Sequence, residues 1–192
     1  MTLEKRKYPG ELASPQQVHA LAEEYRGAAR LLLQLGRHGK PLTRAPFRMA
    51  AIHAIELYLT ALLLHFGLSS NQIRKMQHDL SARTEQSLET GLHLRAKTAK
   101  HLQSLSQNRE YLVTRYGPEL AATVSQINRL TATLEEVATK VTMLITLPPR
   151  RPKQSQSAAD EHQGRPETPS PPSRQPDEVV QEVKPKRRAK AR

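Results

Sequence analysis

The feature that most constrains this chain is an apolar run, Ala50–Leu64, with the sequence AAIHAIELYLTALLL. Only His53, Glu56 and Thr60 interrupt it, so a helix over this run has no polar face. A helix without a polar face must be buried on several sides by other elements. We therefore expect this segment to form a central helix, ended by Gly67, that other helices surround.

A helix is also expected before the central one. Ser14 is a typical N-cap, Pro15 suits the first helical position, and Gln17 completes a capping box. Gly36 marks the expected end of this helix, and residues 1–13 are expected to form a flexible lead-in. Apolar residues three and four positions apart predict its buried stripe: Val18, Leu21, Tyr25, Ala28, Leu32 and Leu35.

Three further helical segments are expected after the central one. Asp79 is a typical N-cap for a helix over residues 79–89, and residues 92–116 are helical by composition. A long helix is expected over residues 119–147. Its apolar residues form a heptad seam: Ile127, Leu130, Leu134, Val137, Val141 and Leu144. The seam can close a bundle or pair with a second copy, and we favour closure because it spans fewer than the three or four heptads typical of a coiled coil.

The fold class follows from these patterns. No segment alternates polar and apolar residues with period two, so we predict an all-α protein, an antiparallel bundle of four or five helices over residues 14–147. Residues 148–192 hold nine of the fourteen prolines and almost no large apolar residues. Such a segment cannot bury enough surface to offset its ordering entropy, so we predict a disordered tail.

Composition limits the function classes. A formal net charge of +12 and a pI near 10.3 favour anionic partners, namely nucleic acid, anionic lipid or acidic protein surfaces, although the charge can also serve solubility alone. The absence of cysteine excludes disulfides and thiolate metal sites. No apolar run reaches the roughly 20 residues that span a bilayer, and no signal peptide is recognisable. We expect a soluble, cytoplasmic protein without a membrane partner.

Several motifs over residues 15–146 resemble the HEPN superfamily of helical domains. They are the Glu56-containing central helix, the H-D-L sequence at residues 78–80, Arg109-Glu110-Tyr111 and Arg115-Tyr116. The family includes metal-independent ribonucleases, often toxins or defence proteins, and non-catalytic members that bind nucleotides, RNA or a protein partner. In active members an Arg and a His, with four to six residues between them, meet across a dimer. The Arg steadies the phosphate and the His acts on the ribose 2′-hydroxyl. The resemblance thus implies a homodimer, and no cofactor or metal is expected.

Two Arg/His pairs have this spacing, Arg48 with His53 and Arg95 with His101. About 2.4 such matches are expected by chance from the composition, so two carry no signal. On a helix, positions five and six apart diverge by roughly 140° and 120°, which aims neither pair at one point. Catalysis by these residues therefore remains an alternative.

The polar residues of the central helix admit two interpretations. Glu56 and His53 lie three apart on one face, and a buried Glu needs a partner. They can form a ligand pocket, or Glu56 can pair internally with a residue such as Arg109 or His101; we favour the internal pair. His78 and Asp79 are interpreted mainly as helix capping. The residues for a ligand site or polar core are Glu56, His78, Asp79, Arg109, Arg115 and Tyr116.

Other chemistry has little support in the sequence. No two histidines have the spacing of a helical or zinc-finger metal pair, and there is no Gly-rich phosphate loop or nucleophile elbow. The basic end of the tail can bind nucleic-acid phosphates through Lys184, Lys186, Arg187, Arg188, Lys190 and Arg192. It contains no aromatic residue for base stacking.

The leading prediction is an HEPN-like module that binds RNA, a nucleotide or a partner protein as a homodimer. The first alternative is a metal-independent endoribonuclease that uses one of the Arg/His pairs. The second is a structural adaptor that dimerises through the last helix.

Overall fold

The computed structural model describes residues 8–146, and the predicted tail, residues 148–192, lies outside them. The described residues form helices and connections, without a strand. The α-helices are α1 (Pro15–Gln34), α2 (Ala45–His65), α3 (Ser70–Lys75), α4 (Leu80–Glu89), α5 (Ala96–Gln107), α6 (Glu110–Tyr116) and α7 (Ile127–Thr146); the 3-10 helices are η1 (Pro41–Arg44) and η2 (Pro118–Leu120). The all-α fold is confirmed, with more and shorter helices than the four or five predicted.

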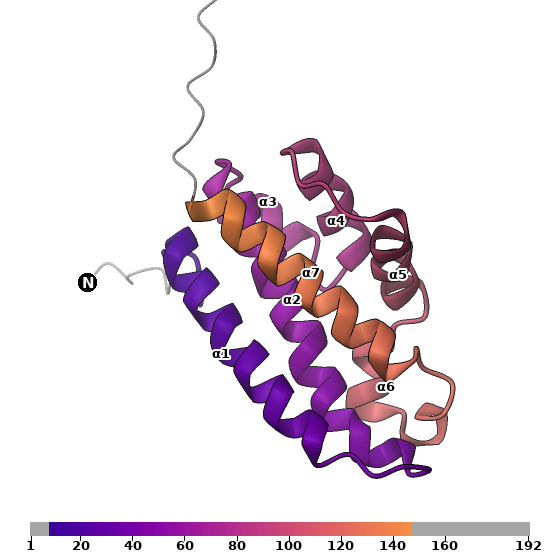
Figure 1. Ribbon diagram of the computed structural model, residues 1–192. Helices are drawn as coiled ribbons and strands as arrows, with labels where there is room; N and C mark the ends of the chain where they lie inside the picture. The colour runs from indigo at the N-terminus through magenta and orange to yellow at the C-terminus, as the bar shows by residue number, and fades with distance from the viewer. Residues whose placement is uncertain (1–7, 147–192) are drawn as a thin grey trace, which may run out of the picture. The chain divides into compact units, whose positions relative to one another are not determined.

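Helix α2 is the centre of the bundle, as its apolar sequence predicts. It contacts α1, α4, α6 and α7 (Figure 1), and twelve of its 21 residues are buried. Tyr58, Leu59 and Leu62 are wholly inaccessible. The stretch Pro41–His65 is long and apolar enough to cross a membrane, but 67% of its apolar window is buried inside the fold. We interpret it as the core helix of the bundle.

The directions of the long helices bring three helix ends together. α1 and α2 run antiparallel, whereas α7 runs beside α2 in the same direction (Figure 1). At one end, Arg48 of α2 donates a hydrogen bond to the carbonyl of Ser125, just before α7. At the other end, His19 of α1 lies 2.8 Å from the hydroxyl of Thr142. The C-terminus of α1 and the N-termini of η1–α2 and α7 therefore lie at the same end.

The buried face of α1 differs from the predicted stripe. Val18, Ala22 and Ala29 are buried, whereas Leu21 and Leu35 are exposed. Small residues allow α1 to lie close against α2, so the buried line follows the alanines rather than the leucines. The capping box at Ser14 is present as predicted. Of the predicted lead-in, residues 8–13 form turns, and the carbonyl of Glu11 accepts a bond from Ser70 of α3.

Two helix boundaries differ from those predicted. The segment 92–116 is two helices, because Arg109 adopts a left-handed conformation (φ 49°) between α5 and α6. The last helix begins at Ile127 rather than near residue 119. Its seam is buried against the core within the chain at Leu130, Leu134, Val137 and Val141. The predicted role of the seam in closing the bundle is therefore confirmed.

Candidate functional site

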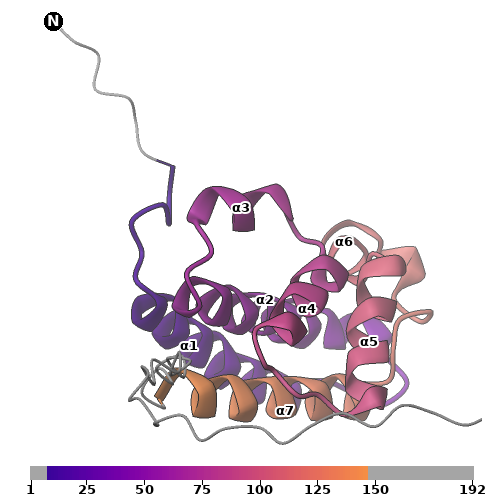
Figure 2. The same ribbon diagram turned by 90° about the horizontal axis from the view of Figure 1, so that it is seen from above.

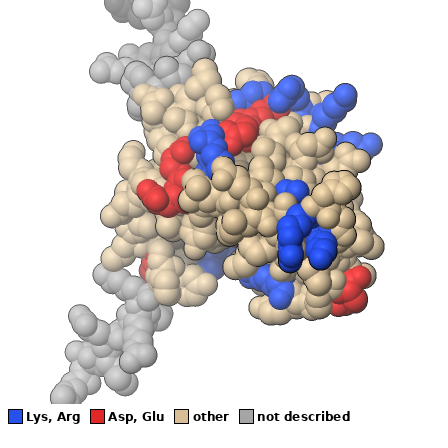
Figure 3. Space-filling model, turned by 60° about the horizontal axis from the view of Figure 1, so that its bottom comes forward, with Lys and Arg blue, Asp and Glu red and all other residues tan. Residues whose placement is uncertain are grey.

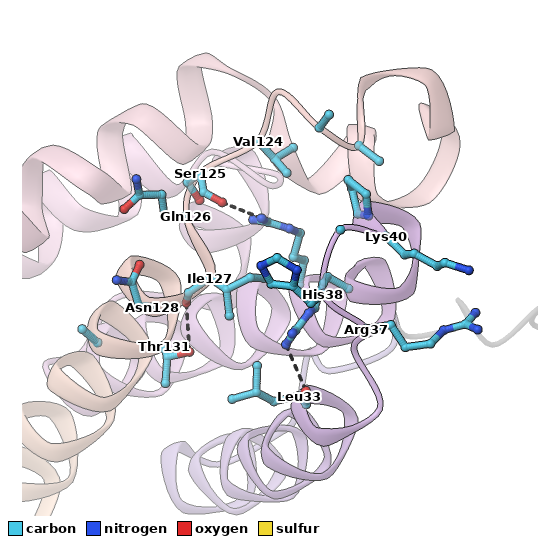
Figure 4. Close-up of a pocket in the computed structure, with 17 residues that line it drawn as sticks. Leu33, Arg37, His38, Lys40, Val124, Ser125, Gln126, Ile127, Asn128 and Thr131 are labelled. Atoms are coloured by element: carbon cyan, nitrogen blue, oxygen red, sulfur yellow. Dashed lines mark hydrogen bonds between the residues drawn. The ribbon is translucent and has the colours of Figure 1, made fainter.

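A basic concavity lies where the three helix ends meet. It is an open cleft of about 1110 Å³ between the α1–α2 connection and residues 121–132 (Figure 4). None of the described residues that line it is Asp or Glu. Its basic residues are Arg37, His38, Lys40, Arg44 and Arg48. Figure 3, which turns this end of the bundle forward, shows Lys and Arg side chains over it. The cleft thus has the charge of an anion-binding site.

The basic loop between α1 and α2 is held by short-range contacts. Gly39 turns the chain with φ +71°. The Thr43 hydroxyl accepts a bond of 2.8 Å from the amide of Arg37 and donates one of 2.8 Å to the carbonyl of Lys40. The loop therefore presents Arg37 and Lys40 at the rim, while His38 points toward Ile127 across the cleft (Figure 4).

Arg44 packs beneath this loop. Its Nη1 donates a 3.1 Å bond to the carbonyl of Leu33, which satisfies an acceptor at the end of α1. Its side chain also covers Gly36, where a Cβ would lie 2.2 Å from the Arg44 Cδ. The glycine is therefore required for this close approach, and Arg44 supports the wall of the cleft.

Arg48 lies deepest among the basic side chains of the cleft and is only 7% exposed. Its Nη2 donates to the carbonyl of Ser125, and its Nη1 lies 3.5 Å from the carboxylate of Glu110. That carboxylate accepts bonds of 2.7 and 3.0 Å from the amide and hydroxyl of Ser125. Burial lowers the pKa of Arg48, against the attraction of Glu110. Within residues 8–146, Nε and Nη1 of Arg48 have no hydrogen-bond partner.

The start of α7 adds a second source of positive potential. Gln126, Ile127 and Asn128 line the cleft, so the N-terminal turn of this 20-residue helix faces it. The partial positive charge of a helix N-terminus favours anions. Together with the exposed side chains of Arg37 and Lys40, it makes this end of the bundle suited to phosphate groups.

The structure does not join the predicted catalytic pairs. Arg48 is committed to Glu110 and Ser125, whereas the ring of His53 meets Tyr25 edge to face, with centroids 4.4 Å apart. Burial lowers the pKa of His53.

In the second pair, His101 is fully buried, and its Nδ1 lies 2.7 Å from the Thr133 hydroxyl. Burial, together with Arg129 and Arg48, lowers the pKa of His101 to about 4. Arg95 instead donates through Nε to Glu136 at 2.6 Å. Neither pair converges on an exposed point of the described chain.

The internal partner of Glu56 is Arg83 of α4, and the expectation of Arg109 or His101 is wrong. The Glu56 carboxylate lies 3.2 Å from Nη2 of Arg83 and 3.1 Å from Nδ1 of His78. Nη1 of Arg83 donates a 3.0 Å bond to the Thr60 hydroxyl. Arg83 is buried, and burial lowers its pKa.

The remaining predicted residues have separate positions. Asp79 caps α4 by accepting bonds of 2.9 and 3.2 Å from the amides of Ser81 and Ala82, as predicted. A hydrogen bond from Ser106 is the main cause of its lowered pKa. Arg109, Arg115 and Tyr116 are exposed on or before α6. Of these three, only Arg115 lines a shallow depression that Glu56 also borders.

The sequence reasoning missed the cleft itself. Its local signal is the basic run Arg37-His38-Gly39-Lys40, but its opposite wall comes from residues far along the chain. The predicted nucleic-acid tail, residues 184–192, lies outside the described residues. Comparisons with protein-family models, curated proteins and solved structures find no match. The shape and charge of the basic cleft are therefore the features of the described chain that bear on its function.

Proposed function

We propose that this chain is a non-catalytic, HEPN-like module that binds RNA through the basic cleft between α1, α2 and α7. The observation that carries the proposal is the composition of the cleft: five basic side chains and, among the described residues that line it, no carboxylate. Phosphate groups are the anions that such a surface neutralises most effectively, because binding releases condensed counterions.

The arrangement of the cations supports a polyanion rather than a single small anion. Arg37 and Lys40 extend from the rim (Figure 4). Arg48 is buried deeper and bonds the carbonyl of Ser125, just before α7. The cleft is open to solvent, and its volume of about 1110 Å³ lies above the range of roughly 300–1,000 Å³ for small-ligand sites. Successive phosphates of one strand can therefore contact the rim and the floor together.

The absence of catalysis is part of the proposal. A catalytic His must reach the proton that it transfers, and His101 is enclosed between Thr133 and the core. Among the four residues of the predicted Arg/His pairs, Arg48 lines the cleft, and it is tied to Glu110. These contacts favour binding without cleavage, with RNA hydrolysis kept as an outcome of the test. A homodimer belongs to the same proposal and is tested by sedimentation.

The test compares RNA binding by two double variants of the full chain. Arg37→Glu/Lys40→Glu reverses the charge at the rim of the cleft, and we expect roughly a tenfold or larger loss of affinity at low salt. The matched control, Lys97→Glu/Lys100→Glu, changes the net charge equally at two exposed residues of α5. We expect a clearly smaller loss for the control. Fluorescence anisotropy with a labelled RNA in EDTA measures both.

Equal losses in the two variants would show binding by net charge alone and would contradict a site at the cleft. The RNA recovered from each reaction is then run on a gel. Products that end in a 2′,3′-cyclic phosphate, and that disappear in His53→Ala or His101→Ala, would overturn the non-catalytic proposal in favour of the ribonuclease.

A further inference from the structure

A second, smaller cavity adjoins the basic cleft. Its volume is about 250 Å³, and it lies between the start of α2 and the α6–η2 turn. Most of the residues that line it are apolar: Pro41, Leu42, Ala45, Val113, Pro118, Ala121 and Val124; the others are Arg48, Thr114 and Arg115. Pro41, Arg48, Ala121 and Val124 line both the cavity and the cleft. The two spaces are therefore separated only by side chains that they share.

We propose that the cleft takes single-stranded RNA and that one unpaired base of the strand enters this cavity, an inference that rests on the proposed function. A base has two apolar faces and a polar edge, and the cavity has the matching character. Its walls are mostly aliphatic, and Arg48 stands at its boundary with the cleft. A base within a duplex is stacked and paired, so only an unpaired base can be inserted in this way.

Arg48 connects the two parts of the site. It lines both spaces, it is nine-tenths buried, and its Nε has no hydrogen-bond partner within residues 8–146, whereas its Nη1 faces the carboxylate of Glu110. Carbonyl oxygens and ring nitrogens at a base edge accept hydrogen bonds from such donors. Arg115, exposed at the other side of the cavity, supplies a guanidinium plane on which a base can stack.

The size of the cavity favours one base over a larger occupant. Pockets for drug-sized molecules hold roughly 300–1,000 Å³, and this one is smaller. An aliphatic side chain of a protein partner is the alternative occupant of comparable size. That partner would need no phosphate, so the ligands of the test separate the two.

The first experiment uses the unmodified full chain and three ligands of equal phosphate number: a single strand, a duplex of half its length, and a single strand of abasic nucleotides. We expect the normal single strand to bind about tenfold more tightly than the abasic strand at the same salt, from the loss of one stacked base. We also expect it to bind more tightly than the duplex. Equal affinity for normal and abasic strands would overturn the base cavity while leaving the phosphate cleft intact. Failure of every RNA to bind would instead overturn the proposed function.

The second experiment fills the cavity. Ala45 lines the small cavity but not the cleft, so Ala45→Leu reduces the space for a base without removing a cation. We expect this variant to bind normal and abasic strands equally, with the affinity that the unmodified chain has for the abasic strand. The control is Ala20→Leu on the exposed face of α1, which should keep the preference for the normal strand. Retention of the full preference in Ala45→Leu would contradict the assignment of this cavity.

Discussion

Buried polar side chains determine what the individual residues of this bundle can do. The imidazole of His101 has one nitrogen against Thr133, and its Nε2 has no partner within residues 8–146. Arg129 and Arg48 add positive potential, which opposes protonation. With a pKa of about 4, this ring is neutral at pH 7. It therefore contributes to packing and hydrogen bonding rather than to proton transfer at a surface site.

The depressed pKa of His101 makes a prediction about stability and pH. The pKa of the His101 side chain is about 6.5 in the unfolded chain and about 4 in the folded chain. The contribution of the neutral His101 ring to the free energy of unfolding is therefore complete above pH 6.5 and decreases as the pH falls to about 4. The contribution of this group amounts to about 3 kcal/mol. His101→Asn keeps a partner for Thr133 but cannot titrate, so its free energy of unfolding should decrease less over this range.

Urea unfolding of both proteins between pH 4 and pH 7 measures the difference. His53, whose pKa burial also lowers, is present in both proteins and cancels in the comparison. Parallel stability curves for the two proteins would show that His101 does not titrate as described.

At the residue scale, the sequence could predict which polar side chains must be paired, but not the residues with which they pair. The apolar run around Glu56 indicates that this carboxylate is buried and must be paired, and Asp79 has the residue type and position of a cap. The identity of the partner depends on the angle at which α4 crosses α2, and no local pattern encodes this angle. Arg83 was therefore missed. The cleft escaped prediction for the same reason, because its walls come from residues 33–48 and 121–132.

At the scale of elements, the starts of α1 and α4 were predictable from their caps, whereas the break between α5 and α6 and the start of α7 were not. Glu110 illustrates why. Its carboxylate binds the amide and hydroxyl of Ser125 and faces Arg48, so it holds the segment before α7 in a non-helical path. These tertiary contacts override local helix propensity, which is a weak determinant. The left-handed Arg109 then directs α6 so that Glu110 reaches this position.

Replacement of Glu110 should therefore affect more than one element. Glu110→Ala leaves the buried Arg48 without its counter-charge and the amide of Ser125 without its acceptor. We expect a loss of roughly 3 kcal/mol or more in the free energy of unfolding. The control Glu119→Ala removes an exposed carboxylate nearby and should change the same quantity by less than about 0.5 kcal/mol. Urea denaturation measures both, and similar stabilities for the two variants would contradict the role of Glu110.

At the scale of the whole molecule, two groups of cations enter the proposed function. One lines the cleft and is positioned by the fold. The other is the run of six cations in residues 184–192, beyond the described part of the chain. In the proposed function, the cleft positions the strand, whereas the tail adds attraction that does not depend on sequence. Each phosphate that a cation neutralises adds its own counterion release, so each group of cations contributes its own share to the salt dependence of binding.

Deletion of residues 184–192 should therefore change the salt dependence of RNA binding without abolishing binding. Each neutralised phosphate of a single strand contributes about 0.7 to the slope of log affinity against log salt, so six cations contribute about 4 at most. The deleted chain should show a slope reduced by up to this amount. It should still prefer normal over abasic strands, because that preference belongs to the cavity beside Arg48. A salt titration by fluorescence anisotropy of both chains measures the slopes. An unchanged slope would remove the tail from the interface, whereas loss of the base preference would place that preference in the tail rather than in the bundle.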